Sequence, residues 1–323
     1  MPEPGVRSYH GHQVIKTPVW SWEIPCYFFT GGLAGASAGL AYLAELRGND
    51  ELGRRAWAAS MAGIALSPPL LISDLGRPMR FLNMLRMFKV TSPMSVGSWI
   101  LSGSGVATTV AALHAWSGRF PRLAKVSRPA AALLGLPLST YTGALLAHTA
   151  VPVWHESRQL LPVVFGSGAA LSAGAAAVML TPPEAAAPAR RLALAGAVLE
   201  TGLKQAMEKR LGAVGGPYAE GPGSRFGRIA DGLIGSGAAL LATRGRHGRG
   251  PAALAGGLLL AGALSVRWSV FGAGLQSASD PEYVVGPQRE AIERGERRGA
   301  ARRASKVTRP DPALGSPATA VWR

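Results

Sequence analysis

The sequence predicts an all-α integral membrane protein with about eight transmembrane helices. The first observation is composition: 48% of the 323 residues are hydrophobic and only 16% are charged, whereas soluble domains carry about 25% charged residues. The second is that the charged residues gather in short clusters between long apolar runs. The third is that each run has roughly the 17–25 residues that a helix needs to cross a bilayer.

The apolar runs follow one another at residues 25–46, 56–73, 94–117, 129–150, 160–181, 190–208, 224–243 and 251–276. In the first run, Gly31, Gly35 and Gly39 recur every four residues, a spacing that lets two helices approach closely. The sixth run is the least apolar, because it contains Glu200 and Lys204. Eight spans place both chain termini on one side of the membrane, which we call the near side.

The segments outside the runs fit the same architecture. Residues 1–24 are polar, and residues 279–323 form a basic tail that we expect to be flexible. Tryptophans near the ends of runs are typical interfacial anchors; they are Trp20, Trp22, Trp99, Trp116, Trp154 and Trp268. The basic tail and the arginines after the second run favour a multi-pass protein of the plasma membrane with cytoplasmic termini.

Composition also excludes several classes of function. The net charge is +16, but the basic residues lie in loops and in the tail without interleaved aromatic residues, so we expect contacts with membrane lipid and not with nucleic acid. The single cysteine, Cys26, excludes an internal disulfide and a self-ligated iron–sulfur cluster, which needs about four thiolates. A haem held by two histidines needs both imidazoles at one depth, but His114 falls on the far side and His148 towards the near side, so no haem is expected. No metal site is predicted either.

Helix direction brings polar residues of the first four runs together on the near side. Odd runs start there and even runs end there, so Glu23 and Tyr27 open the first run and Asp74 follows the second. Tyr141 and His148 fall in the second half of the fourth run. Taken alone, a membrane tyrosine or histidine is more often an anchor or a packing residue. Because ionisable groups at a membrane are costly, their convergence indicates a site.

This cluster suits the chemistry of a membrane quinone. A quinone needs hydrogen-bonding groups for its two carbonyls, a flat apolar slot for its ring and a route for protons. Tyr141 or His148 could bond one carbonyl, and Glu23 or Asp74 could relay protons.

The loop from Asp74 to Trp99 is the most distinctive segment of the chain. Asp74 stands three residues before Arg77 and six before Arg80, so a local salt bridge that shapes the loop is one interpretation. Methionine, phenylalanine and leucine alternate with arginine between residues 79 and 88. This pattern predicts a short amphipathic helix lying on the membrane, where it could cap the site or dock a partner.

The second half of the chain carries four charged residues inside predicted spans: Glu200, Lys204, Asp231 and Arg267. Charge pairing between helices is one interpretation of them. A proton path through the last four helices is the other.

These residues resemble the NrfD/polysulfide reductase family of membrane subunits. The resemblance rests on WSWEIPCYFFTGGLAG (20–35), on DLGRPMRF followed by SPMSVGSW, and on YTGALLAHTAVPVW (141–154). It implies two four-helix bundles, at 25–155 and 156–278, with a quinone site in the first bundle beside a peripheral four-cluster iron–sulfur subunit. The family's quinone-site tyrosine corresponds to Tyr141. Tyr27 replaces a histidine found in some members. A polar group one turn earlier corresponds to Glu23 or Ile24, and we favour Glu23.

The resulting prediction is a subunit that exchanges electrons between the quinone pool, menaquinone or another quinone, and the iron–sulfur subunit. We assign the central roles to Tyr141, Glu23 and Asp74. Further quinone contacts are expected from Tyr27, Arg77, Arg80, Ser95, His148 and Trp154. A catalytic subunit containing molybdenum or tungsten would complete the complex. One possibility is a subunit that resembles formate dehydrogenase. The alternatives are a secondary transporter or proton channel, and a passive anchor for a peripheral enzyme.

Overall fold

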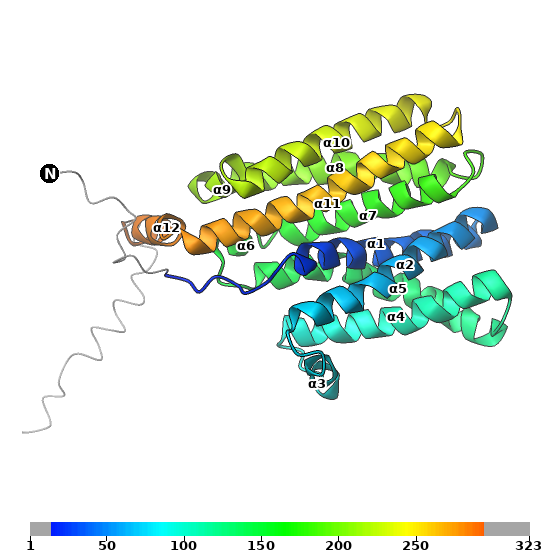
Figure 1. Ribbon diagram of the computed structural model, residues 1–323, viewed down its shortest axis with the longest axis horizontal. Coiled ribbons are helices and arrows are strands. Elements are labelled where there is room, and N and C mark those ends of the chain that lie inside the picture. Colours follow the sequence, from blue (N-terminus) through cyan, green and yellow to red (C-terminus); the bar gives the residue numbers. More distant parts are fainter. Residues whose placement is uncertain (1–13, 294–323) are drawn as a thin grey trace, which may run out of the picture.

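The computed structural model describes residues 14–293, and every regular element in this range is a helix (Figure 1). The elements in chain order are α1 (Glu23–Leu46), α2 (Asp50–Asp74), α3 (Arg80–Arg86), α4 (Pro93–Ser117), α5 (Pro121–Ala147), α6 (Pro152–Glu156), α7 (Leu161–Leu180), α8 (Ala187–Leu211), η1 (Gly212–Gly215), α9 (Gly216–Ala219), α10 (Pro222–Arg244), α11 (Arg249–Ser279) and α12 (Glu282–Glu293). Most of the predicted basic tail, from residue 294 on, lies outside the described residues, as do residues 1–13.

The eight long helices coincide with the eight apolar runs, which confirms the all-helical prediction for the described part of the chain. The largest differences are at α2 and α5, which begin at Asp50 and Pro121, several residues before their runs. Five helices have the length and hydropathy of a membrane span: α2, α4, α5, α7 and α11. The predicted amphipathic segment contains the short helix α3.

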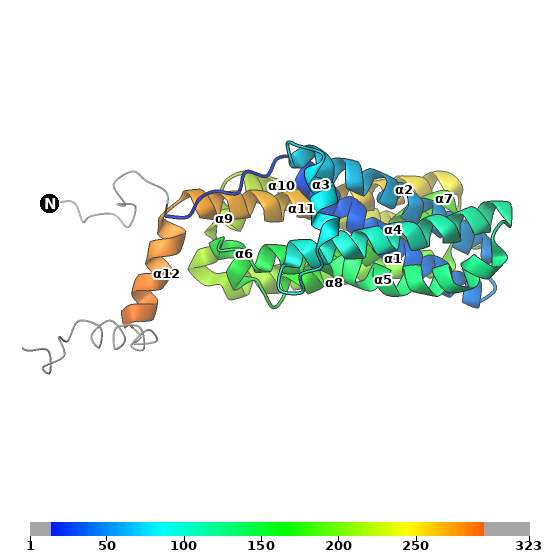
Figure 2. The ribbon, with the colours of Figure 1, turned by 90° about the horizontal axis from the view of Figure 1, so that it is seen from below.

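The long helices pack in two groups that meet along α1 and α7. Helices α1, α2, α4 and α5 contact one another, and so do α7, α8, α10 and α11 (Figures 1 and 2). Helix α1 also contacts α7 and α11, while α7 contacts α5 and α2. Helix α1 therefore has protein neighbours from both halves of the chain, which explains why so much of it is buried.

The closest contact between helices of the first group joins α1 and α5. A Cβ added at Gly35 would lie 2.4 Å from the carbonyl oxygen of Gly135, and one added at Gly135 would lie 2.3 Å from that of Gly35. Only glycine lets two backbones approach this closely. The glycine pattern of the first run therefore has a local cause at Gly35, whereas a Cβ at Gly39 would meet nothing within 4 Å.

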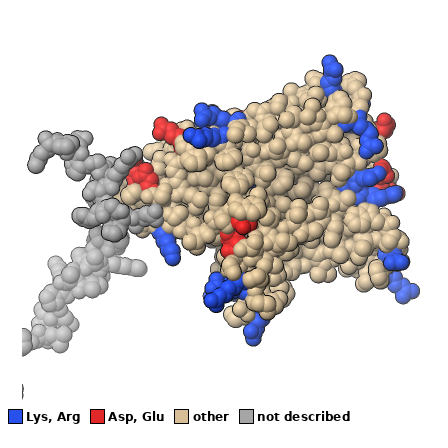
Figure 3. Space-filling model, in the orientation of Figure 1, with Lys and Arg blue, Asp and Glu red and all other residues tan. Residues whose placement is uncertain are grey.

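The two ends of the molecule differ in structure. The near end carries the short helices α3, α6, α9 and α12 and the described part of the N-terminal segment (Figures 1 and 2). At the far end, short turns at 47–49, 118–120, 181–186 and 245–248 join the long helices. On the face shown in Figure 3, lysine, arginine and acidic side chains gather near the ends of the helices, with long uncharged stretches between them. This distribution fits helices that cross a bilayer.

Replacing Gly35 by alanine is expected to lower the free energy of unfolding by about 1–3 kcal/mol, because the new methyl group would overlap backbone atoms of α5. Thermal unfolding of the purified protein in detergent measures the change. Gly39→Ala is the matched control, and we expect it to keep or raise the melting temperature, since alanine favours helices over glycine. Equal melting temperatures of the two variants would contradict the close α1–α5 contact.

Candidate functional site

Two tyrosines, one on α1 and one on α5, are in contact inside the first helix group (α1, α2, α4 and α5). The hydroxyl of Tyr27 on α1 is hydrogen-bonded to the hydroxyl of Tyr141 on α5. Tyr27 is only 1% exposed, whereas Tyr141 is half-buried. The Tyr141 ring lies against Gly97 of α4, where an added Cβ would come within 2.1 Å of a ring carbon. Three helices thus fix the position of this pair.

A second polar contact holds the backbone beneath Tyr27. The hydroxyl of Thr30 donates toward the carbonyl oxygen of Tyr27 at 3.3 Å and lies 2.9 Å from the hydroxyl of Ser67 on α2. Ser67 in turn donates to the carbonyl of Gly63 at 2.8 Å. These buried hydroxyls join α1 to α2 within one turn of Tyr27 and so restrain the backbone of α1 at that residue.

Two carboxylates converge at the near end, one turn before Tyr27 on α1. The side chain of Ser21 is hydrogen-bonded to Glu23, and it lies 2.9 Å from Oδ1 of Asp74. The Ser21 backbone N–H also donates to Asp74 Oδ1 at 3.0 Å. Ser21 has a single hydroxyl hydrogen for two carboxylate neighbours. The Ser21 hydroxyl can therefore donate to only one of the two carboxylates at a time.

Arg77 and Arg80, two predicted quinone contacts, lie in the connection between α2 and α4, and a third, Ser95, lies in the first turn of α4. Arg77 and Arg80 are exposed, and the Arg80 guanidinium donates to the carbonyl of Leu75 at 3.3 Å. Among the described residues no ion pair joins Asp74 to either arginine, so the local salt bridge considered from sequence is replaced by the bonds to Ser21. Ser95 holds the loop, as its hydroxyl donates to the carbonyl of Met87 at 3.0 Å.

His148 and Trp154 also make structural contacts. His148 caps the end of α5 as an exposed side chain, and its Nδ1 lies 2.8 Å from the carbonyl of Ala144. Trp154 is fully buried, donates from Nε1 to the carbonyl of Val270 at 2.8 Å and stacks on Trp20 with ring centroids 5.8 Å apart. Trp154 therefore ties α6 and the N-terminal segment to α11.

The charged residues of the second half form ion pairs between helices. Arg267 of α11 bonds Oε1 of Glu200 on α8 at 2.8 Å, and these side chains are 1% and 0% exposed. The guanidinium also donates to the carbonyl of Phe165 at 3.0 Å and lies 4.3 Å from the centre of that ring. Gly168 makes the space, because a Cβ there would lie 2.0 Å from Glu200 Oε1. Glu200 Oε2 and Arg267 Nε have no partner among the described residues.

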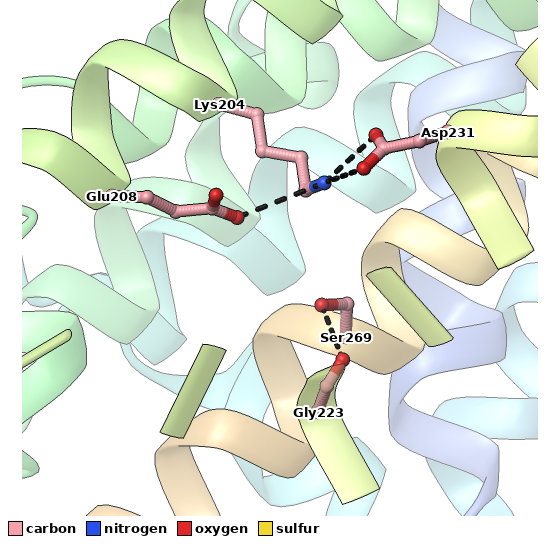
Figure 4. Close-up of polar contacts among 5 residues, drawn as sticks. All are labelled: Lys204, Glu208, Gly223, Asp231 and Ser269. Carbon is pink, nitrogen blue, oxygen red and sulfur yellow. Dashed lines mark hydrogen bonds and ion pairs between the residues drawn. The ribbon is translucent and has the colours of Figure 1, made fainter. Parts of the chain in front are cut away.

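The second pair lies one turn further along α8. The ammonium group of Lys204 lies 2.8 and 3.0 Å from the two carboxylate oxygens of Asp231 on α10, and 3.7 Å from Glu208 (Figure 4). The Lys204 side chain is 5% exposed, whereas that of Asp231 is 46% exposed. The four charged residues singled out from sequence thus form a line of charges that runs from a buried pair to a more accessible one.

Aromatic rings connect the tyrosine pair to the buried ion pair. The Tyr27 and Phe28 rings are 6.2 Å apart, and Phe28 lies 5.8 Å from Phe165 of α7. Phe165 carries the Arg267 guanidinium on its face. The two candidate centres are therefore in continuous van der Waals contact across the seam between the two helix groups.

Sequence reasoning missed several of these residues. Ser21 and Gly97 have no charge or motif of their own, and their roles follow from which neighbours they meet across helices. Buried Trp57 was also missed: its Nε1 donates to Glu45 at 2.9 Å, beside Arg128. A polar residue two positions before Glu23, and a glycine in an otherwise well-formed span, are the signals that could have drawn attention to the first two.

Comparison with known proteins identifies a family to which the sequence is similar. A family model described as polysulfide reductase, of the NrfD type, matches residues 8–279. The matched range contains both tyrosines, both near-end carboxylates and both ion pairs. None of the curated proteins compared with the chain matches it.

Replacing Arg267 by methionine is expected to lower the free energy of unfolding by about 3–5 kcal/mol, because it leaves the Glu200 carboxylate buried without its main partner. The double variant Glu200→Leu/Arg267→Met should recover most of the loss. Thermal unfolding of the two single variants and the double variant measures the coupling.

The exposed pair of Glu51 and Arg55, 3.0 Å apart, is the matched control. Its disruption should cost less than about 0.5 kcal/mol. Additive effects of the Glu200 and Arg267 substitutions would contradict a direct interaction between these side chains.

Proposed function

The chain belongs to the NrfD/polysulfide reductase family of multi-pass membrane proteins, and from this premise we propose that it is the quinone-reactive membrane subunit of an oxidoreductase complex. Family members are typically membrane subunits of such complexes. The observation that supports the proposal most directly is the hydrogen-bonded pair of Tyr27 and Tyr141 at the near end of the first helix group.

The tyrosine pair fits the hydrogen-bonding needs of a quinone carbonyl. Two hydroxyls joined by one hydrogen bond keep one hydrogen free for a further acceptor. Because Tyr27 is 1% exposed and Tyr141 is half-buried, we assign Tyr27 as the donor to Tyr141, which leaves the Tyr141 hydroxyl hydrogen to bond a carbonyl oxygen. Gly97 leaves room for the Tyr141 ring, and the Thr30 hydroxyl bonds the backbone carbonyl of Tyr27.

The Glu23–Ser21–Asp74 cluster supplies protons in this proposal. A bound quinone takes up two electrons and two protons to become a quinol, or releases them in the reverse direction. Glu23 precedes Tyr27 by four residues, about 6 Å along the helix, and both carboxylates are half-buried at the near end. The cluster can therefore exchange protons with water on one side and pass them towards the tyrosines on the other.

The electrons must come from a partner, because one cysteine cannot ligate an iron–sulfur cluster. We propose a peripheral four-cluster iron–sulfur subunit bound at the near end, with a molybdenum or tungsten catalytic subunit beyond it, formate dehydrogenase-like being one choice. The short helices α6, α9 and α12 lie at this end, whereas in the described residues short turns join the long helices at the far end (Figure 1). We further propose the plasma membrane as the location, with the near end cytoplasmic.

All eight long helices cross the membrane in this proposal, as two four-helix bundles. Helices α1, α8 and α10 are 24, 25 and 23 residues long, which is enough to span a core of about 30 Å. Helix α1 is surrounded by other helices, so it needs less hydrophobicity than a lipid-facing span. The polar residues of α8 and α10 include the ion pairs with α11 and with each other.

A second role in proton translocation is favoured by the ion pairs of the second group. Charges buried in a membrane are costly and commonly mark proton routes. Glu200 keeps one oxygen unpaired, and the line of charges continues through Lys204 to the accessible Asp231. The alternative, a secondary transporter, predicts broken helices at matching positions in the two halves of the chain.

Tyr141→Phe is expected to weaken binding of a fluorescent quinol analogue, heptyl-hydroxyquinoline N-oxide, about tenfold, because one hydrogen bond is lost. Tyr27→Phe should have a smaller effect, since it removes only the group that orients Tyr141. Fluorescence quenching on the purified complex measures affinity, and quinone-dependent electron transfer is measured in parallel. The matched control is Tyr42→Phe, at the far end of α1. Unchanged affinity and turnover in both site variants would refute the site assignment.

Asp231→Asn is expected to lower the number of protons moved per electron by half or more, while quinone-dependent electron transfer continues. The reason is that an amide cannot exchange a proton at the accessible end of the line of charges. A pH-sensitive dye inside proteoliposomes containing the complex measures the ratio. Glu51→Gln, an exposed carboxylate of the far end, serves as the control. If the number of protons moved per electron is unchanged in Asp231→Asn, these charges have only a structural role.

A further inference from the structure

The connection between α2 and α4 has an unusual balance of charge. We call residues 75–92, which include α3, the α3 loop. It contains four basic residues and no acidic one. The four are all exposed: Arg77, Arg80, Arg86 and Lys89. A short surface with this charge attracts anions, and its attraction is not cancelled from within the loop.

The same loop exposes large apolar side chains. Among them, Met79 and Met87 are each 70% exposed, Val90 is 72% exposed, Phe88 is 61% exposed and Leu82 is 52% exposed. A patch of this kind on a water-facing surface marks an interaction site. Basic residues interspersed with exposed methionine, phenylalanine and leucine are typical of segments that lie between lipid headgroups and acyl chains.

The place of the α3 loop in the fold favours lipid as its occupant. It joins α2 and α4, both of which have the length and hydropathy of a membrane span. Its helix packs against α4 and extends sideways from the end of the first group (Figures 1 and 2). A segment that leaves two spans at their ends and extends sideways lies at the depth of the phospholipid headgroups.

The loop is fixed to the first turns of α4. The Ser95 hydroxyl accepts from the Lys89 backbone N–H at 3.1 Å and donates to the carbonyl of Met87 at 3.0 Å. Trp99 donates from Nε1 to the same carbonyl at 3.4 Å and meets the Phe88 ring edge-on. Gly97, which contacts the Tyr141 ring, lies between Ser95 and Trp99. The loop is therefore attached to the turn of α4 that positions Tyr141.

We propose that the α3 loop binds anionic phospholipid, with its arginines and lysine at the headgroup phosphates and its exposed apolar side chains among the acyl chains. The interaction would anchor the loop, and through it the first turns of α4, at the lipid-facing edge of the tyrosine pair. This inference rests on charge, exposure and placement and does not depend on the proposed quinone chemistry.

The triple variant Arg77→Gln/Arg80→Gln/Arg86→Gln tests the role of charge. Each basic residue near an anionic surface strengthens the attraction about fivefold, so we expect the triple variant to bind phosphatidylglycerol at least about tenfold more weakly. Titration of the delipidated protein in detergent, followed by native mass spectrometry, counts the bound lipids. Phosphatidylcholine with the same acyl chains tests whether the anionic headgroup is recognised.

The matched control removes three charges from the far end, as Arg119→Gln/Arg122→Gln/Lys125→Gln. We expect it to keep the affinity of the α3 loop for phosphatidylglycerol. An equal loss in both triple variants would show a general charge effect and overturn the proposal, as would unchanged binding in the α3 loop variant or equal binding of the two lipids.

A spin label on the exposed Leu82 tests where the loop lies. The label is attached to Leu82→Cys in a Cys26→Ser background, and the protein is placed in nanodiscs that contain phosphatidylglycerol. We expect oxygen, which partitions into lipid, to relax the label more than a water-soluble nickel chelate does. Preferential access of the nickel chelate would overturn the proposal. The proposal would also be overturned if the label were accessible to both reagents without the iron–sulfur partner and protected from both when the partner is bound. That result would identify the loop as a protein interface.

Discussion

The close contact between α1 and α5 at Gly35 and Gly135 sets the geometry on which the candidate site depends. The two helices run in opposite directions, so moving towards the near end means moving back along α1 and forward along α5. Tyr27 is eight residues before Gly35, and Tyr141 is six residues after Gly135, displacements of about 12 and 9 Å. The glycine contact thus brings the two hydroxyls to similar depth, and it brings the backbones close enough for them to bond.

The second constraint is the cost of burying charge, and the second helix group meets it by pairing charges of opposite sign. Glu200 with Arg267, and Lys204 with Asp231, leave no cation of this line without a carboxylate. Such pairs contribute little net stability, because the loss of hydration offsets the attraction between the charges. Their presence therefore needs an explanation other than stability. The unpaired oxygen of Glu200 and the exposure of Asp231 are what a proton-exchanging role requires.

Depth in the membrane could be predicted from sequence, whereas contacts across helices could not. The eight helices follow from apolar length, because bilayer thickness is a strong constraint, and helix direction grouped Glu23 with Asp74 and Tyr27 with Tyr141 at one end. The angular position of a residue around its helix depends on packing, so Ser21 and Gly97 were missed. For the same reason His148 and Trp154 were expected at the quinone, although their described contacts are with backbone carbonyls and neighbouring rings.

The proposed function requires protons, electrons and a quinone to reach the tyrosine pair, the first two from the near end and the third from the bilayer. Protons would come from the near end, where the Glu23–Ser21–Asp74 cluster lies one turn before Tyr27. Electrons would come from a partner bound at the same end, where the short helices α6, α9 and α12 lie. The quinone would come from the bilayer, and we expect it to pass α4 and the α3 loop, because the Tyr141 ring lies against Gly97 of α4 and Ser95 of the same helix holds the loop. If the α3 loop binds lipid at that edge, the edge stays in contact with the bilayer. A lipid-soluble quinone could then reach the tyrosine pair there, whereas water-soluble molecules could not.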